Sequence, residues 1–312
     1  MKKKVFIGSS SESANIAEKI KDCFQTEYDC VIWKDDFFQL NQSTYETLLK
    51  KSIYFDYAIF VGGKDDFVRR YSNQKTKKAV RDNVYFELGL YTGILSKDRT
   101  FFFVHSEVKI ATDLLGITIL KYDQPNDIIS GCQRIHERMK EEDTINRIML
   151  LPSTSLAISY YKNFLKPLGD VVSEYEKIYY DGKGYNINSW HMSIILPQNC
   201  NIDWRIWASQ FYKYRKVTNY EIMGKLRNFS VKMYADKLSN EHELSLLDVP
   251  QSLSTSFEAV ELVTGKDYIG NTEELSYMKE KEVQNFILAL YNLISNNPIL
   301  NRKIEIIREN SY

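Results

Sequence analysis

The sequence is poor in the features that mark several protein classes. Its 312 residues include only six prolines and 13 glycines, which excludes collagen-like and proline-rich chains. No apolar run approaches the roughly 18 residues that span a bilayer, and the apolar stretch near the N-terminus is too short for a signal peptide. We therefore expect a cytoplasmic protein without a membrane partner.

Cysteine and surplus charge are also scarce. The four cysteines, Cys23, Cys30, Cys132 and Cys200, show no CxxC spacing and no histidine at metal-ligand spacing, so we expect structural thiols and no metal site. Basic and acidic residues number 41 each. A sequence-independent duplex binder needs a basic surplus to release counterions, so we expect no nucleic-acid partner.

What is present is the composition of a globular protein, with 44% hydrophobic and 26% charged residues. At roughly 100–200 residues per domain, the length predicts two domains. In the first half, short apolar runs at 4–8, 30–33, 57–61, 100–104 and 117–120 alternate with helical patterns. Continuous apolar strands between helices predict a parallel α/β sheet covered on both faces. Ligands bind such sheets at the carboxyl ends of the strands, here the loops 8–11, 33–43 and 62–83.

The second half has a different pattern. Pro152 marks a boundary, so we assign domains to residues 1–148 and 149–312. One long helical pattern covers 155–180, with a possible kink at Pro167. Strand patterns at 190–196, 228–234 and 244–249 and helical patterns at 254–263 and 280–296 follow, and together they predict an α+β domain.

The most informative segment of the first half is 81–89. Asn83 and Glu87 are four residues apart, so they project together from the first turns of a predicted helix. A carboxylate beside a neutral amide suits binding of ribose hydroxyls and stabilisation of an oxocarbenium-like transition state. The alternative is a surface glutamate that stabilises the helix start through the helix dipole. Spacing alone favours the alternative.

Residues 5–12 and 81–89 closely resemble the TIR-like (Toll/interleukin-1 receptor-like) domains of bacterial defence proteins, over most of residues 1–125. The resemblance implies a flavodoxin-like, five-stranded parallel sheet. It also implies hydrolysis of the nicotinamide–ribose bond of NAD⁺, with Glu87 as the catalytic glutamate. NAD⁺ is then a substrate, and no cofactor is expected.

The same resemblance implies contacts to NAD⁺ elsewhere in the domain. Gly8 permits close backbone approach, and Ser9, Ser10 and Ser11 at a helix N-terminus suit a phosphate or ribose. The loop 33–43 lies where TIR domains contact a neighbouring TIR domain. Two further candidates each have two interpretations: Phe37 (or Phe38) stacks on a ring of the substrate or packs within its own loop, and Arg81 binds a phosphate or forms a structural ion pair. Asn83 supports Glu87 from the same helix.

Four segments of the second half, 156–165, 194–200, 227–230 and 247–252, together resemble the ligand-binding domain of STING, the cyclic dinucleotide receptor. The resemblance implies that Phe164 stacks on a base and that Arg227, on the lid of the site, reaches phosphates or base edges. It implies that Asp248 accepts the guanine exocyclic amine and that Ser252 lies nearby. The alternatives are a core role for Phe164 and a turn hydroxyl for Ser252.

The two halves together resemble the bacterial TIR–STING fusion proteins of antiphage systems. This implies an NAD⁺ glycohydrolase that releases nicotinamide and ADP-ribose when cyclic di-GMP, made by a cognate synthase, binds a homodimer of the STING-like half. Assembly into filaments and depletion of NAD⁺ would follow. The main alternative is a non-enzymatic assembly module that recruits partners. A phosphorelay receiver is disfavoured, because Gly62 and Gly63 stand where its acceptor aspartate belongs.

Overall fold

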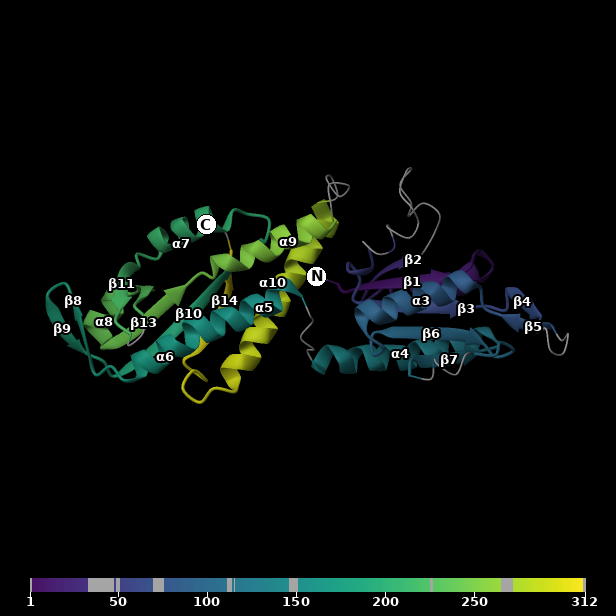
Figure 1. Ribbon diagram of the computed structural model, residues 1–312, viewed down its shortest axis with the longest axis horizontal. Helices are drawn as coiled ribbons and strands as arrows, with labels where there is room; N and C mark the ends of the chain where they lie inside the picture. The colour runs from purple at the N-terminus through teal and green to yellow at the C-terminus, as the bar shows by residue number, and fades with distance from the viewer. Residues whose placement is uncertain are drawn as a thin grey trace. The chain divides into compact units, whose positions relative to one another are not determined.

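The chain forms two compact units, Met1–Arg147 and Ile148–Tyr312 (Figure 1). The computed structural model describes residues 2–32, 48, 51–69, 76–110, 114, 116–145, 151–224, 227–264 and 272–310. Each unit has its own buried hydrophobic cluster. Within these ranges no helix is long and apolar enough to cross a membrane.

The first unit is built on a five-stranded sheet with strand order β2-β1-β3-β6-β7. All four strand pairs are parallel, which confirms the predicted flavodoxin-like sheet. The strands are β1 (Lys4–Ser9), β2 (Asp29–Ile32), β3 (Tyr57–Gly62), β6 (Thr100–His105) and β7 (Thr118–Tyr122). The helical elements are η1 (Ser11–Ser13), α1 (Ala14–Phe24), α3 (Asp82–Leu95) and α4 (Pro125–Ile145).

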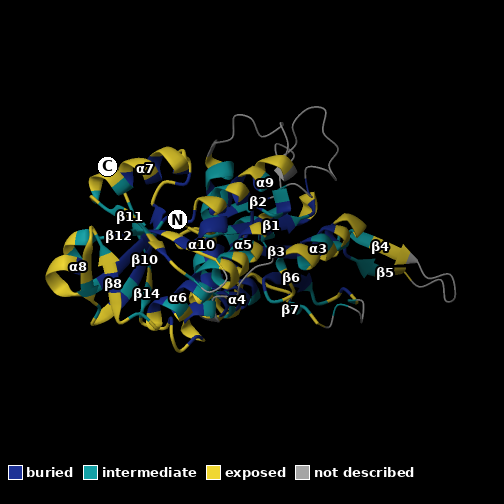
Figure 2. Cartoon of the chain, turned by 60° about the vertical axis from the view of Figure 1, so that its left-hand side comes forward, coloured by how far each residue is buried: buried dark blue, intermediate teal, exposed yellow. Residues whose placement is uncertain are grey.

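Helices cover both faces of this sheet, which explains why its strands read as continuous apolar runs. Helices α1 and α4 pack on one face, and α3 packs over β1, β3 and β6 on the other. On the α3 face the Phe6 ring stacks on Tyr91 at 4.4 Å between centroids. Figure 2 shows the buried strands beneath the more exposed helices.

One part of the predicted loop 62–83 is a β-hairpin. Strands β4 (Asp66–Arg69) and β5 (Thr76–Ala79) pair antiparallel and lead into α3. Gly62, which ends β3, lies where a Cβ would come within 2.6 Å of a Val80 methyl carbon. The glycine therefore lets the end of the hairpin pack against the sheet.

The second unit contains a mixed sheet with strand order β11-β12-β13-β10-β14, as an α+β domain requires. Strand β10 is parallel to β13 and β14, and β11 and β12 form an antiparallel hairpin that joins β13. The strands are β10 (Ser189–Pro197), β11 (Thr218–Ile222), β12 (Phe229–Met233), β13 (Glu243–Asp248) and β14 (Ile304–Glu309). The helical elements are α5 (Pro152–Tyr160), η4 (Tyr161–Leu165), α6 (Lys166–Ser173), α7 (Trp204–Tyr214), α8 (Ala235–Glu241), η5 (Gln251–Leu253), α9 (Ser254–Thr264) and α10 (Thr272–Ser295).

The helix predicted over 155–180 is too long. It ends at Ser173, and β8 (Lys177–Tyr180) and β9 (Lys183–Asn186) form a hairpin after it. Asp181 and Gly182 join these strands, both with positive φ, at 46° and 71°. Asp-Gly is a strong sequence signal for this two-residue hairpin turn, and it indicates that the residues on either side of it are strands, not the end of a helix.

The helix also continues through Pro167. A π-helical turn just before this proline widens the helix. Elements α5, η4 and α6 are continuous, and η4 is a π-helical turn in which the Lys166 N–H donates to the Tyr161 carbonyl, five residues back. A proline inside a regular α-helix costs about 3 kcal/mol, since it lacks an N–H and its ring meets the carbonyl four residues earlier. For Pro167 that carbonyl belongs to Asn163.

Candidate functional site

Helix α3 carries the predicted catalytic residue on its buried face. Val84, Glu87, Leu88 and Tyr91 are buried, at the three- and four-residue spacing of one helix side. Three of them are apolar, and Glu87 is only 8% exposed. Helix α3 connects β3 to the parallel strand β6, so its first turns lie at the carboxyl ends of the strands. That edge is where sheets of this kind bind ligands.

The Glu87 carboxyl has no hydrogen-bond or ion-pair partner among the described residues. Burial removes water from it without replacement, which raises its pKa from 4.5 to about 7. A buried carboxyl without partners costs folding free energy, and such groups concentrate at functional sites. A positively charged ligand beside Glu87 would therefore stabilise its ionised carboxylate.

The two candidates that precede Glu87 are more exposed. Asn83 lies one turn earlier on α3, at the four-residue spacing that the sequence predicts, and is exposed. The Arg81 guanidinium pairs with Glu12 at 2.6 Å and, more loosely, with Asp66 at 3.7 Å. Of its two sequence interpretations, the structural ion pair is the one observed in the ligand-free chain.

Two of the serines before α1, Ser10 and Ser13, bond a carboxylate of the same chain. Ser10 caps η1 by accepting the Ser13 N–H at 3.3 Å, and its hydroxyl donates to Asp65. The Ser13 hydroxyl donates to the same carboxylate at 3.2 Å. The Asp65 carboxylate thus bonds the Ser10 and Ser13 hydroxyls at the helix start, where the sequence predicts a phosphate or a ribose. Ser9 and Ser11 take no part in these bonds.

Gly8 has a packing role in this unit. A Cβ there would lie 2.6 Å from Cε1 of Phe60, its partner on β3. The glycine therefore admits the Phe60 ring, and the predicted close approach of a ligand is not needed to explain it. The remaining candidate of this unit, Phe37, lies outside the described residues, as do Phe38 and the whole loop 33–43.

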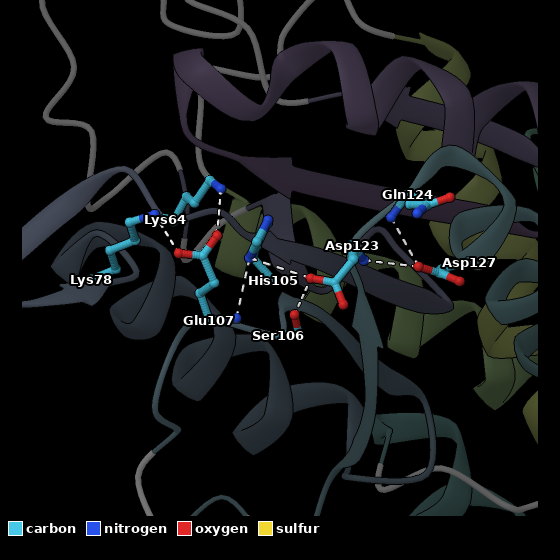
Figure 3. Close-up of polar contacts among 8 residues, drawn as sticks. All are labelled: Lys64, Lys78, His105, Ser106, Glu107, Asp123, Gln124 and Asp127. Carbon is cyan, nitrogen blue, oxygen red and sulfur yellow. Dashed lines mark hydrogen bonds and ion pairs between the residues drawn. The ribbon is translucent and has the colours of Figure 1, made fainter.

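Figure 3 shows a polar network at the carboxyl ends of β6 and β7. In contrast to Glu87, the carboxylates of this network have partners within the same unit. Lys64, at 2.7 Å, and Lys78 both donate to the Glu107 carboxylate, and these bonds lower its pKa to about 2. The Asp127 carboxylate accepts the backbone N–H of Asp123 at 2.9 Å. The two lysines neutralise the Glu107 charge, whereas backbone N–H groups stabilise the Asp127 carboxylate. Within the described residues no group of three or more histidine, cysteine, aspartate or glutamate side chains fits a metal ion.

In the second unit Tyr160 contacts two of the four predicted ligand-binding residues, Phe164 and Asp248. Its ring lies 5.3 Å from the half-buried Phe164 ring, one turn later on the same helix, and its hydroxyl donates to Asp248 Oδ2 at 2.5 Å. Burial raises the Asp248 pKa, although the hydrogen bond from Tyr160 opposes this rise. An aromatic face and a shielded carboxylate thus meet at one place.

Arg227 lies beside the same aromatic group. Its guanidinium is 4.8 Å from the centre of the Phe229 ring, which in turn is 6.3 Å from the Phe164 ring. Its Nη2 donates to the carbonyl of Asn163. The structure therefore brings Phe164, Arg227 and Asp248 together through Tyr160 and Phe229.

Ser252 belongs to different surroundings. It lines a polar cavity of about 500 Å³ between the start of α7 and the start of α9, together with Asp203, Arg205 and Thr255. None of Phe164, Arg227 and Asp248 lines this cavity. In the single chain Ser252 is thus separate from the other three candidates.

Three residues of these sites were not among the sequence candidates. Asp65 follows the glycines after β3, and nothing local indicates that it reaches Ser10. Tyr160 precedes Phe164 by four residues, so helical spacing offered a signal that it shares the same helix face. Phe229 lies two residues after Arg227, but the ring contact to Phe164 depends on the hairpin β11–β12 folding back onto the helix.

Comparison with known proteins decides the family. The model for the CAP12/Pycsar effector protein TIR domain matches residues 4–124, and the model for the prokaryotic STING domain matches residues 152–291. A CD-NTase-associated protein 12 from Flavobacterium daejeonense is 34% identical, over 99% of this chain and 100% of the relative. The chain belongs to the CD-NTase-associated protein 12 family.

A second relative of that name, from Lachnospiraceae bacterium (strain RUG226), is 31% identical over 98% of this chain and 99% of its own. Among solved structures, bacterial STING in complex with c-di-GMP is similar to this chain with 25% identity and a TM-score of 0.47, over 52% of this chain and 98% of that one. The predicted resemblance to TIR–STING fusion proteins is confirmed by the two domain models and by the full-length relatives.

Proposed function

We propose that this CD-NTase-associated protein 12 family member is an NAD⁺ glycohydrolase that cyclic di-GMP activates. The unpartnered, buried Glu87 carboxyl carries the proposal. A buried group with a strongly perturbed pKa is typical of functional sites, and the positive charge of a bound nicotinamide ring favours the ionised Glu87 carboxylate.

The reaction breaks the bond between ribose C1′ and the nicotinamide nitrogen. The bonding electrons leave with nicotinamide, which becomes neutral, so no general acid is required. Positive charge develops on the ribose C1′ and ring oxygen, and the Glu87 carboxylate stabilises it from the low-dielectric face of α3. Water then adds to C1′ and loses a proton, which yields ADP-ribose. In this proposal Asn83, one turn earlier on α3, hydrogen-bonds the ribose hydroxyls.

The second unit supplies the trigger in this proposal. A guanine stacks on Phe164, its exocyclic amine donates to Asp248, and Arg227 contacts the phosphates or base edge. Two such half-sites in a two-fold homodimer match the symmetry of cyclic di-GMP. The ligand favours filament assembly only if it binds the assembled state better, and assembly then completes the NAD⁺ site through the loop 33–43.

The consequence for the cell would be depletion of NAD⁺ during phage infection. The relatives' name associates them with a CD-NTase, which supports a cognate cyclic nucleotide synthase as the source of the ligand. A Pycsar effector protein from Pseudomonas aeruginosa is similar over 42% of this chain, and the family model for residues 4–124 is named for the TIR domain of CAP12 and Pycsar effector proteins. A TIR domain shared with effector proteins of another name supports the proposed division into effector and sensor.

The deciding experiment measures nicotinamide release from NAD⁺ by the full chain across a panel of cyclic dinucleotides. We expect release with cyclic di-GMP and little without it. Equal rates with and without the dinucleotide would remove the trigger. Binding and assembly without any release would overturn the enzymatic assignment and leave a non-enzymatic assembly module.

A further inference from the structure

Pro167 creates a hydrogen-bond acceptor on the surface of the long helix of the second unit. In an α-helix the N–H of residue 167 would donate to the carbonyl of Asn163, four residues earlier. Proline has no N–H, so the helix itself cannot satisfy this carbonyl in that way. The π-helical turn η4 ends at Leu165, two residues before Pro167, and widens the helix around Asn163.

The freed carbonyl is occupied by Arg227, which lies 64 residues away in sequence. Its Nη2 donates to the Asn163 oxygen, while its guanidinium lies over the Phe229 ring at 4.8 Å. Among the described residues the Arg227 side chain forms no other hydrogen bond or ion pair. Arginine carries five N–H donors, so one bond to Asn163 leaves donors for a ligand.

The backbone around Arg227 fits closely against its own hairpin. A Cβ on Gly224 would lie 2.3 Å from the Arg227 carbonyl oxygen, so this position accepts only glycine without a shift. A cavity of about 400 Å³ lies between the helix and the hairpin, and Asn163, Pro167, Gly224, Arg227 and Phe229 are among its lining residues. The contact is therefore a specific junction between two elements.

We infer that Pro167 is a positioning residue: by freeing the Asn163 carbonyl it holds Arg227, and with it the hairpin β11–β12, beside Phe164 before any ligand binds. The inference rests on the proposed role of Phe164 and Arg227 in binding cyclic dinucleotides. Holding an arginine in place lowers the ordering cost that the ligand must otherwise meet. Pro167 and the Asn163 carbonyl need not touch the ligand.

The test compares Pro167→Ala with Pro152→Ala in the full chain. Pro152 is the first residue of α5, where a missing N–H has no helical partner to lose, so it is the matched control. Pro167→Ala restores the N–H and allows an α-helical bond to Asn163. We expect a higher unfolding midpoint of this unit, because alanine suits a helix interior better than proline.

Despite that stabilisation, Pro167→Ala should bind cyclic di-GMP about five- to tenfold more weakly, the value of one hydrogen bond lost. In the Arg227→Ala background the same change should have no further effect. Unchanged or tighter binding by Pro167→Ala, or an equal loss in both backgrounds, would refute the inference.

A ligand-free measurement separates this inference from the proposed function. Amide hydrogen exchange in β12 should be faster in Pro167→Ala than in the wild type, and unchanged in Pro152→Ala. If the wild type binds no cyclic dinucleotide, the proposed function fails, while faster exchange still supports the contact. Unchanged exchange shows that Arg227 is not held through Pro167, whatever the ligand result.

Discussion

Each unit contains one shielded carboxyl at its candidate site, and the two differ in what surrounds them. Burial raises the pKa of both Glu87 and Asp248. Glu87 has no partner among the described residues, whereas Asp248 accepts a hydrogen bond from the Tyr160 hydroxyl. Both carboxyls are therefore shielded from water, but only Asp248 has a hydrogen-bond donor beside it.

The difference separates a reacting group from a recognition group. A carboxyl that must stabilise transient positive charge gains from having no competing partner, so its full charge is available in the transition state. A carboxylate that must read one edge of a base gains from a fixed orientation, which Tyr160 provides. The Glu107 network in Figure 3 is a third case, where exposed carboxylate charge is neutralised by two lysines.

The largest effect should come from Glu87→Gln, which keeps the shape and removes the charge. We expect nicotinamide release to fall at least about 100-fold, as when a preorganised electrostatic contact is removed. Binding of cyclic di-GMP should not change. The matched control is Glu107→Gln, at the edge of the same unit, which should retain activity. Wild-type turnover by Glu87→Gln would show that this carboxyl does not take part.

The sequence was sufficient for the five parallel strands of the first unit, because burial on both faces leaves continuous apolar runs. In the second unit it missed α7, although Asp203 caps that helix and Trp204, Trp207 and Phe211 follow at helical spacing. Glu87 was assigned by a motif. Asp65 and Tyr160 were not found, because their contacts to Ser10 and Asp248 span 55 and 88 residues.

The second prediction concerns pH and separates the carboxyls of the first unit. Between about pH 5 and 7 folded Glu87 keeps a proton that the unfolded chain releases, so this group lowers the free energy of unfolding as pH rises through that range. The shift from 4.5 to about 7 corresponds to at most about 3 kcal/mol.

Denaturant unfolding of the first unit at pH 5 and pH 8 measures this effect. Glu87→Gln should be more stable than the wild type at pH 8 and similar to it at pH 5. Glu107→Gln should not reproduce that pattern, because its carboxylate has a lowered pKa and is already ionised over this range. An unchanged pH dependence in Glu87→Gln would indicate that Glu87 finds a partner in the folded chain.

The third prediction concerns Asp248→Asn. The Tyr160 hydroxyl donates to one oxygen, so the new amide should turn its oxygen toward Tyr160 and its NH₂ toward the guanine amine. Two donors then face each other, and we expect about 30-fold weaker binding of cyclic di-GMP. Binding of cyclic di-AMP, which lacks that amine, is the internal control and should change less. Equal losses for both ligands would show that Asp248 does not read the base.

The smallest effect, Tyr160→Phe, tests whether orientation is what Tyr160 provides. In the wild-type background the loss of one hydrogen bond to Asp248 should weaken cyclic di-GMP binding about fivefold, while the ring contact with Phe164 remains. In the Asp248→Asn background the sign should reverse, because the amide is then free to turn its oxygen toward the guanine amine. Calorimetric titration of the four proteins in this cycle measures the coupling directly. Weaker binding of equal size in both backgrounds would mean that Tyr160 supports the pocket without orienting Asp248.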